Sequence, residues 1–557
     1  MKTNIPAIQL CALATALCSL AVAQTSKLSK DLQNVTVSTN VIVQFTAVPS
    51  KTVLSGVTAK GGTLTKSIAN SRFALFNLTP TAIAALATNT NVRYASPNRV
   101  VKKKLEFAEP AVRADIALQY GFDGAGVGVA VIDSGIANGL ADFSNGSRVI
   151  YSEGLADGTT STADVYGHGT QVAGVIAGNG SQSSGSNAIY TFRGIAPNAK
   201  LINLRVLDDN GQGTDFAVIN GIERAIALKS TYNIRVINLS LGRQVMESYT
   251  TDPLCQAVED AWKAGIVVVV AAGNNGRDNS QNTNGYSTIT SPGNDPYVIT
   301  VGAMKDMGSA DRSDDAIASY SSKGPTLLDQ IAKPDLVAPG NNIRSTLSPK
   351  GSMPTLYPSN VVPVSYYVST NANSTSNQYF MLSGTSLAAP MVSGAAALLI
   401  QKDPTLTPDT VKARLMKTAT KNFPKSSVAC DTTTGQCYTS YYDLFTVGAG
   451  YLDVWAALNS TDMVPTGYTA QSPKVVADGF GTVNLVGSSS IVWGASIVWG
   501  TSIVWGTSTI SGTSTVVEPT SIVWGTSTSE GYSIVWGTSI VWGTSSPFSE
   551  SLAIRGE

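Results

Sequence analysis

Short, continuous apolar runs alternate with segments of helical periodicity through the central part of the chain. The runs lie at residues 127–132, 201–206, 236–239, 266–272 and 298–301, and helical patterns such as 216–228 and 253–264 lie between them. Continuous rather than alternating apolar residues are typical of strands covered on both faces of a parallel sheet. Residues 106–460 are therefore predicted to form an α/β domain with a doubly wound, mainly parallel sheet. Ligands and chemistry are then expected at the carboxyl ends of the strands.

A smaller unit is predicted before this domain, over residues 24–105. Residues 41–45, 73–78 and 92–94 have the pattern of strands. Thr79 and Pro80 open a helix that continues through Leu86, with Thr79 as the cap and Pro80 in the first turn. These elements indicate a small α+β unit, a sheet with helices on one face. Lys102-Lys103-Lys104 marks an exposed boundary.

Residues 461–557 form a repetitive C-terminal extension. Ile-Val-Trp-Gly occurs six times, beginning at Ile491, Ile497, Ile503, Ile522, Ile534 and Ile540, and contains six of the 8 tryptophans. The basic step of six residues is even, so it preserves the alternation of a strand. One interpretation is a low-complexity segment without fixed structure. The tryptophans favour the other, a stacked β array that self-associates or attaches to a surface.

The N-terminus has the features of an export signal, predicted over residues 1–23. Lys2 precedes an apolar stretch at 10–20, and Ala21-Val22-Ala23 is a small-x-small cleavage site. A membrane anchor is the weaker interpretation, because the apolar run is short and is interrupted by Thr15 and Ser19. No later run reaches the roughly 18 apolar residues that span a bilayer. We expect a secreted or extracellular protein without a transmembrane segment.

Charge and histidine content exclude several classes of function. The 37 Lys and Arg residues balance the 37 Asp and Glu residues, so no global basic field attracts nucleic acid. His168 is the single histidine, which excludes zinc sites built on paired histidines. Any step that uses an imidazole must use His168.

Three of the five cysteines belong to the predicted mature chain, because Cys11 and Cys18 lie in the export signal. Cys430 and Cys437 flank a polar turn segment and are expected to form a disulfide in an oxidising compartment, with two free surface thiols as the alternative. Cys255 lies in a segment of helical apolar spacing. It is predicted to be a core thiol rather than a nucleophile.

Three short motifs place reactive side chains at the ends of predicted elements. Asp133 follows the strand at 127–132, His168 opens a helix rich in small residues, and Ser386 opens the long apolar helix that runs to Ile400. A serine hydroxyl is a weak nucleophile that needs a base, and an imidazole supplies one near neutral pH. A carboxylate fixes the tautomer of that imidazole. Asn274 follows the strand at 266–272 and can donate to an oxyanion, with the Ser386 backbone N–H as second donor.

These motifs closely resemble those of the subtilisin-like serine proteases, the subtilase family. The order Asp133, His168, Ser386 is that of subtilisin. The resemblance extends to residues 131–136, 194–197, 236–242, 271–274, 321–325, 338–340 and 448–454, and residues 35–105 resemble the family's inhibitory propeptide. It implies a secreted serine endopeptidase made as a zymogen, which hydrolyses protein or peptide substrates through an acyl-enzyme. Its own propeptide would act as an intramolecular inhibitor.

The same resemblance implies a substrate-binding cleft. One wall of the primary specificity pocket would be Ser240-Leu241-Gly242, the opposite wall Ala272-Gly273, and the backbone of Gly211-Gln212-Gly213 would pair with an extended substrate. An ordinary turn is the alternative for Gly211 and Gly213. Arg243 departs from the family, in which a second glycine is common, so the side-chain preference stays open. Asp164 is equally compatible with a helix cap and with the rim of the cleft.

The chemistry requires no cofactor. Subtilases often bind structural calcium, but no calcium ligand can be assigned to a residue of this sequence. A different class of function is the alternative: a surface adhesion or assembly protein that works through its repeat tail and uses proteolysis mainly for maturation.

Overall fold

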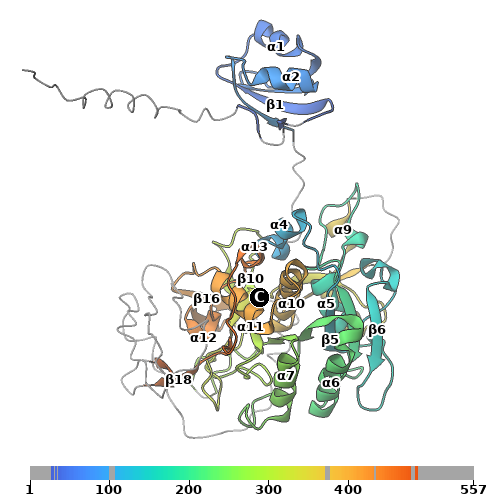
Figure 1. The fold of residues 1–557 in the computed structure, drawn as a ribbon, viewed down its shortest axis with the longest axis vertical. Helices are drawn as coiled ribbons and strands as arrows, with labels where there is room; N and C mark the ends of the chain where they lie inside the picture. The colour runs from blue at the N-terminus through green and yellow to red at the C-terminus, as the bar shows by residue number, and fades with distance from the viewer. Residues whose placement is uncertain are drawn as a thin grey trace, which may run out of the picture. The chain divides into compact units, whose positions relative to one another are not determined.

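The computed structural model describes residues 27–29, 32–33, 35–98, 107–280, 282–369, 377–431, 434–477 and 483–486. The chain divides into two compact units, residues 1–102 and 103–557 (Figure 1). The predicted export signal, the propeptide junction near residue 105 and all six Ile-Val-Trp-Gly copies lie outside the described residues.

The N-terminal unit is a four-stranded antiparallel sheet with two helices. Its elements are β1 (Thr39–Phe45), α1 (Lys51–Thr58), β2 (Gly62–Ser67), β3 (Phe73–Leu78), α2 (Pro80–Leu86) and β4 (Val92–Pro97), with strand order β2-β3-β1-β4. Alternate residues of β1, Val41 and Val43, are buried in one core with Val57 of α1 and Ile83 of α2. The predicted cap is present, since Thr79 Oγ1 accepts the Ala82 N–H at 3.3 Å.

The second unit is built on an eight-stranded, mostly parallel sheet. Its strands are β5 (Gly128–Asp133), β6 (Val149–Gly154), β7 (Lys200–Arg205), β8 (Ile234–Leu239), β9 (Val267–Ala271), β10 (Ile299–Lys305), β11 (Ala316–Ile317) and β12 (Leu336–Pro339). The order is β11-β10-β9-β8-β5-β7-β6, with β12 also paired to β10. Only β11 is antiparallel to its neighbour. The predicted fold class is confirmed.

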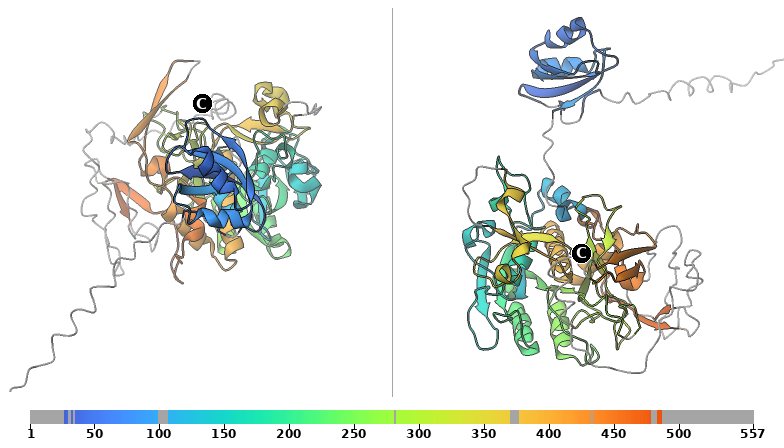
Figure 2. Two further views of the ribbon diagram at one scale, coloured as in Figure 1. Left: turned by 90° about the horizontal axis from the view of Figure 1, so that it is seen from above. Right: turned by 180° about the vertical axis from the view of Figure 1, so that it is seen from behind.

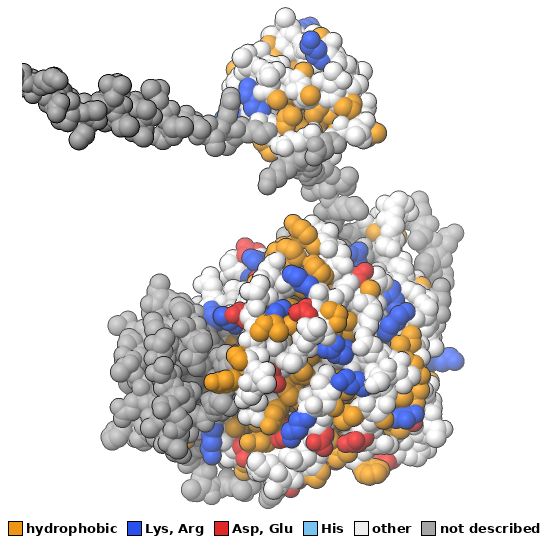
Figure 3. Space-filling view, in the orientation of Figure 1, with side chains coloured by type: hydrophobic (Ala, Val, Ile, Leu, Met, Phe, Trp, Pro, Cys, Tyr) orange, Lys and Arg blue, Asp and Glu red, His pale blue; other side chains and the backbone are white. Residues whose placement is uncertain are grey.

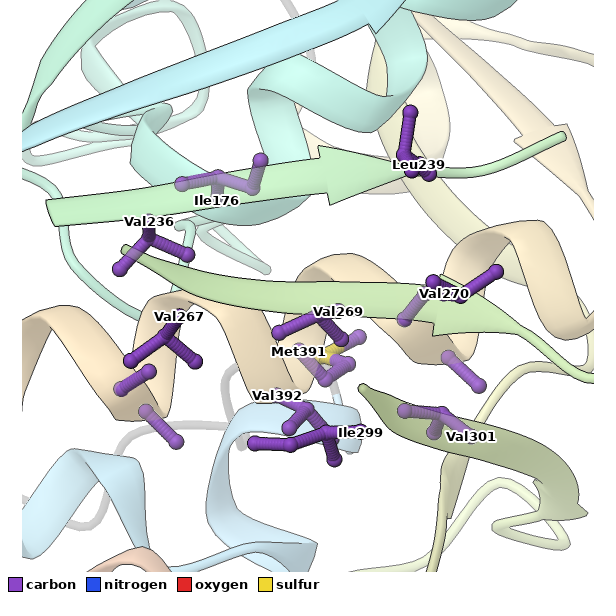
Figure 4. Packing of buried hydrophobic residues seen from close by; sticks show 14 of the residues in the cluster. Ile176, Val236, Leu239, Val267, Val269, Val270, Ile299, Val301, Met391 and Val392 are labelled. Atoms are coloured by element: carbon purple, nitrogen blue, oxygen red, sulfur yellow. The ribbon is translucent and has the colours of Figure 1, made fainter. Parts of the chain in front are cut away.

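Helices cover both faces of this sheet. Those that position the site are α5 (His168–Ala177), α6 (Asp215–Tyr232), α7 (Pro253–Lys263) and α10 (Thr385–Lys402). Helices α5 and α10 pack against each other, and α6 packs against α7 (Figure 1; Figure 2, right). In Figure 4, Met391 and Val392 of α10 lie beside Val269 and Ile299 of the sheet, and all four side chains belong to the same buried core.

Shorter elements complete the unit. The helices are α3 (Ala108–Ala111), α4 (Ala114–Gln119), α8 (Met353–Leu356), α9 (Val364–Tyr367), α11 (Pro408–Thr418), α12 (Leu444–Val447) and α13 (Val454–Asn459). A small sheet consists of β13 (Ile343–Thr346), β14 (Val361–Val362) and β15 (Tyr379–Leu382). Two hairpins pair β16 (Ser426–Cys430) with β17 (Cys437–Tyr441) and β18 (Lys474–Ala477) with β19 (Val483–Val486). The packed core continues beyond the predicted boundary at residue 460, since Ala470 and Val475 are buried in it.

Basic and acidic side chains are interspersed on the face of the molecule that Figure 3 shows, in keeping with a formal net charge of zero. None of the helices in the described ranges combines the length and apolar character needed to cross a membrane.

Candidate active site

Asp133 and His168 meet at the carboxyl edge of the sheet. Asp133 is the last residue of β5 and His168 the first of α5. The His168 Nδ1 atom lies 2.8 Å from Asp133 Oδ1, which also accepts the Ser134 N–H at 2.7 Å. The Asp133 side chain is fully buried, while that of His168 is 15% exposed. The sheet changes winding direction between β5 and β8, the place where ligands bind in such folds.

Glycine at position 169 allows α5 to begin against the end of β5. A methyl group added at Gly169 would lie 2.2 Å from the backbone oxygen of Gly135, far inside van der Waals contact. The Gly169 N–H instead donates to Ser134 Oγ at 2.9 Å. The close approach of the two backbones is what brings His168 to Asp133.

Asp164 anchors the start of α5 from inside the protein. Its carboxylate accepts the Gly167 N–H at 2.7 Å, the Thr170 N–H at 2.8 Å and the Ser134 hydroxyl at 2.9 Å. Only 2% of Asp164 is exposed, so the interpretation as a rim residue is wrong and the capping interpretation holds. Burial raises the pKa of Asp164 above that of an ordinary aspartate.

The pKa of His168 is set by opposing effects. Burial disfavours the imidazolium and lowers the pKa, but the charge of Asp133, its hydrogen bond and the charge of Asp164 together outweigh burial. The pKa of His168 therefore lies above the usual 6.5.

Ser386 lies in the first turn of α10, beside Asn274. Asn274 Oδ1 accepts the Thr385 N–H at 2.9 Å and the Thr385 hydroxyl at 3.1 Å, which fixes the amide so that Nδ2 is its free end. A methyl group added at Gly384 would lie 2.9 Å from Ser386 Oγ and 3.4 Å from Asn274 Nδ2. The hydroxyl and the amide therefore border the same small space.

In the described part of the chain, no hydrogen bond joins Ser386 Oγ to His168. Hydrogen bonds of catalytic groups often tighten only when substrate binds.

A buried polar chain ties the Ser386 turn to the sheet. Ser240 Oγ donates to the Ser386 backbone oxygen at 2.7 Å and accepts from Asn238 Nδ2 at 2.9 Å. Ser393 Oγ of α10 in turn donates to Asn238 Oδ1 at 2.8 Å. Sequence reasoning missed Asn238 and Ser393. The sequence does mark both positions, because Asn238 is a polar residue inside an apolar strand and Ser393 is a polar residue inside an apolar helix.

The two predicted pocket walls approach each other around Thr290. A methyl group added at Gly242 would lie 2.7 Å from Thr290 Oγ1, and one at Gly273 would lie 2.8 Å from Thr290 Cγ2. Ala272 is fully buried, and its backbone bonds to Val301 and Thr290. Leu241 is half-buried. Thr290, which sequence reasoning did not single out, lies against both glycines.

Gly211 lies in a turn. It has φ +76°, and its N–H donates to Asp208 O at 3.2 Å. Gln212 and Gly213 are exposed, so pairing with an extended peptide stays a prediction.

Arg243, the departure from the family pattern, is held by two carboxylates. Its guanidinium lies 2.8 Å from both Asp215 and the buried Asp252.

Comparison with known proteins identifies the family of this chain. A profile of the subtilase family matches residues 124–436. The chain belongs to the subtilase family. A profile of the fervidolysin N-terminal prodomain matches residues 32–98. This subtilase is a serine endopeptidase with an N-terminal prodomain, an arrangement consistent with a zymogen. Both matched regions lie before the repeat tail, and nothing in them supports the adhesion alternative.

Two curated relatives illustrate the match. The serine protease AprX of Bacillus subtilis (strain 168) is 40% identical over 351 residues, covering 62% of this chain and 73% of the relative. Subtilisin E of the same strain is 33% identical over 369 residues, covering 65% and 80%. A crystal structure of a cold-adapted subtilisin-like serine proteinase is 28% identical and covers 60% of this chain and 90% of its own, with a TM-score of 0.40.

The cysteines of the subtilase are placed as predicted. Cys430 and Cys437 form a disulfide, and Cys255 is a free, buried thiol whose Sγ lies 3.3 Å from Asn294 Oδ1. Burial raises the pKa of the Cys255 thiol well above its usual range, so it stays protonated. Across the described ranges, no three His, Cys, Asp or Glu side chains gather as a metal site.

Proposed function

We propose that Asp133, His168 and Ser386 form the catalytic relay of this subtilase and that Asn274 stabilises the oxyanion. The observation that carries this assignment is the 2.8 Å contact between His168 Nδ1 and a fully buried Asp133 carboxylate. That contact leaves the other ring nitrogen, Nε2, to take a proton. Ser386 and Asn274 border one space at the start of α10, where backbone N–H groups point outward.

In the first step, Ser386 Oγ attacks the carbonyl carbon of the peptide bond and its proton passes to His168 Nε2. Asp133 holds Nδ1–H and stabilises the imidazolium without taking the proton. His168 then protonates the leaving amine, and the acyl-enzyme remains on Ser386. Water, deprotonated by His168, hydrolyses the ester and restores the free hydroxyl.

Negative charge develops on the carbonyl oxygen during both attacks. Asn274 Nδ2 and the Ser386 N–H are the proposed donors, and the two bonds from Thr385 hold the Asn274 amide in position before substrate arrives. Donors fixed in advance cost no reorganisation at the transition state.

The proposed setting is an exported zymogen. Residues 24 to about 105 would occupy the cleft as an inhibitor and assist the folding of a slow parallel sheet until self-cleavage. The cleft would bind substrates between Ser240-Leu241-Gly242, Ala272-Gly273 and the Gly211–Gly213 backbone. Structural calcium stays compatible with this proposal, and its ligands are unassigned.

The Ser386→Ala variant tests the assignment. Turnover of a neutral peptide substrate and removal of the prodomain are both expected to fall by about 10⁶-fold, to background. Ser280→Ala, at an exposed loop serine, is the control and should keep full activity. Residual self-processing by Ser386→Ala at the wild-type rate would overturn the proposal.

A further inference from the structure

Arg277, three residues after Asn274, contacts side chains from a distant part of the chain. Its Nη1 lies 3.3 Å from Asp431 Oδ2, and its guanidinium carbon lies 4.5 Å from the centre of the Tyr438 ring. Its Nε donates to Ser319 Oγ at 2.6 Å. Only 7% of the Arg277 side chain and 6% of that of Asp431 are exposed, so the pair is shielded from water. An ion pair and a cation–π contact in such a place are much less screened than on a surface.

Asp431 and Tyr438, which contact Arg277, lie next to the two cysteines of the disulfide. Cys430 and Cys437 face each other across the β16–β17 hairpin and are bonded. Asp431 directly follows Cys430, and Tyr438 directly follows Cys437. The hairpin, which extends from the body of the unit in Figure 2 (left), exposes most of its other side chains. At the end that meets Arg277, Asp431 is buried and Tyr438 is half-buried, while both cysteines are exposed.

The segment between Arg277 and Asn274 has little freedom to absorb a displacement. The Asn275 N–H donates to Ser322 Oγ at 3.0 Å, and the Gly276 N–H donates to Tyr320 O at 2.8 Å. A methyl group at Gly276 would lie 2.0 Å from the Ser321 backbone oxygen, so the turn is pressed against 319–322. The turn therefore holds Arg277 and Asn274 in a fixed relative position.

We propose that Arg277 is a positioning residue for the Asn274 amide and that the disulfide hairpin is the part that holds it in place. Asn274 is then held at two points. Thr385 holds its side chain. The hairpin holds the backbone that follows it, through Arg277. This inference rests on the proposed function, in which Asn274 donates to the oxyanion. It assigns a role in the reaction to a hairpin whose described residues include none of the proposed catalytic or substrate-binding residues. A misplacement of about 1 Å in catalytic geometry costs on the order of 10²-fold in rate.

A double-mutant cycle on kcat separates positioning from general support of the fold. Arg277→Gln is expected to lower kcat by about tenfold with KM unchanged, because the donor acts on the transition state. Asn274→Gly alone is expected to lower kcat by about 10²–10³-fold. Adding Arg277→Gln to Asn274→Gly should then lower kcat by less than about twofold, since no amide is left to position. Rates are expressed per titrated active site, so that only folded enzyme counts.

Two further variants and one control complete the test. Asp431→Asn, and Cys430→Ser combined with Cys437→Ser, should show the same loss of kcat and the same dependence on Asn274. Arg224→Gln is the matched control, because Arg224 also pairs with a carboxylate, Glu153, and lies over a ring, Tyr151, but on α6. It should leave kcat unchanged.

An equal loss of kcat in both backgrounds, or no loss from Arg277→Gln, would overturn the inference while leaving the oxyanion assignment intact. An Asn274→Gly variant with wild-type kcat would instead contradict the proposed function.

Discussion

The hydrogen bond between Asp133 and His168 determines both the tautomer and the proton affinity of the only imidazole in the chain. With Nδ1–H held by the carboxylate, Nε2 is the basic nitrogen. The base works only as the neutral imidazole, and the pKa of His168 is raised above its usual value. Activity is therefore lost, as the pH falls, at a higher pH than an isolated histidine would give.

Asp133→Asn is expected to change the pH profile as well as the rate. The amide favours the wrong tautomer, so kcat should fall by about 10⁴-fold. Because the charge of Asp133 raises the pKa of His168, its removal should move the acid limb of kcat/KM to lower pH. Asp260→Asn, at an exposed position of α7, should change neither. An acid limb that stays in place, or a wild-type limb with two cooperative ionisations between about pH 5 and 8, would contradict this account.

Motifs in the sequence were sufficient to place Asp133 and His168 together, because both follow recognisable element boundaries. They did not reveal the buried partners that orient the site, such as Asn238 and Thr290. A buried polar side chain has no local pattern of its own, and its role depends on what folding brings opposite it.

Close backbone contacts between elements set the position of α5 relative to β5. Gly169→Ala would place a methyl group 2.2 Å from Gly135 O, so the start of the helix must move. We expect a loss of about 1–3 kcal/mol in the free energy of unfolding and a large fall in kcat. Thermal unfolding in the Ser386→Ala background measures the first effect without self-digestion.

Gly139→Ala is the control for this element. The added methyl group meets nothing within 4 Å, although φ is +89°. Its cost should be limited to about 1–2 kcal/mol of backbone strain, with kcat unchanged. Equal kcat values for the two variants would show that the contact between α5 and β5 does not position His168.

Sequence patterns predicted the buried elements better than the exposed ones. Strands β5, β7, β8, β9 and β10 lie within a few residues of the predicted runs, because burial on both faces favours apolar residues at most positions of a strand. The edge strand β2 is exposed along its length, and the β16–β17 hairpin has few buried residues. Neither has a face whose periodicity could be recognised.

The second unit includes a segment that its local sequence does not mark as part of a domain. Ser472 donates to Asp335 Oδ1 at 2.6 Å, and Asp335 also pairs with the buried Lys333 and Lys412. Val475 is 2% exposed in the same core. Residues 461–477 contain no long apolar run or helical period, so their packing could not be predicted from pattern alone.

Two truncations test how far the second unit extends along the chain. Both are made in the Ser386→Ala protein and in the active enzyme. Removing 488–557 should leave thermal stability and kcat/KM unchanged. Removing 461–557 should lower the free energy of unfolding by at least about 1–3 kcal/mol, because the charged cluster loses the Ser472 hydroxyl and the core loses Val475. Equal stability of the two truncated proteins would place the boundary of the unit at residue 460 after all.

The most direct measurement of the central claim is to locate a covalent fluorophosphonate label on the mature protein by peptide mass spectrometry. The relay of Asp133, His168 and Ser386 predicts one adduct, on the peptide that contains Ser386, and its loss in His168→Ala. An unlabelled wild-type protein, an adduct on another serine, or labelling that survives His168→Ala at the wild-type rate would contradict the account.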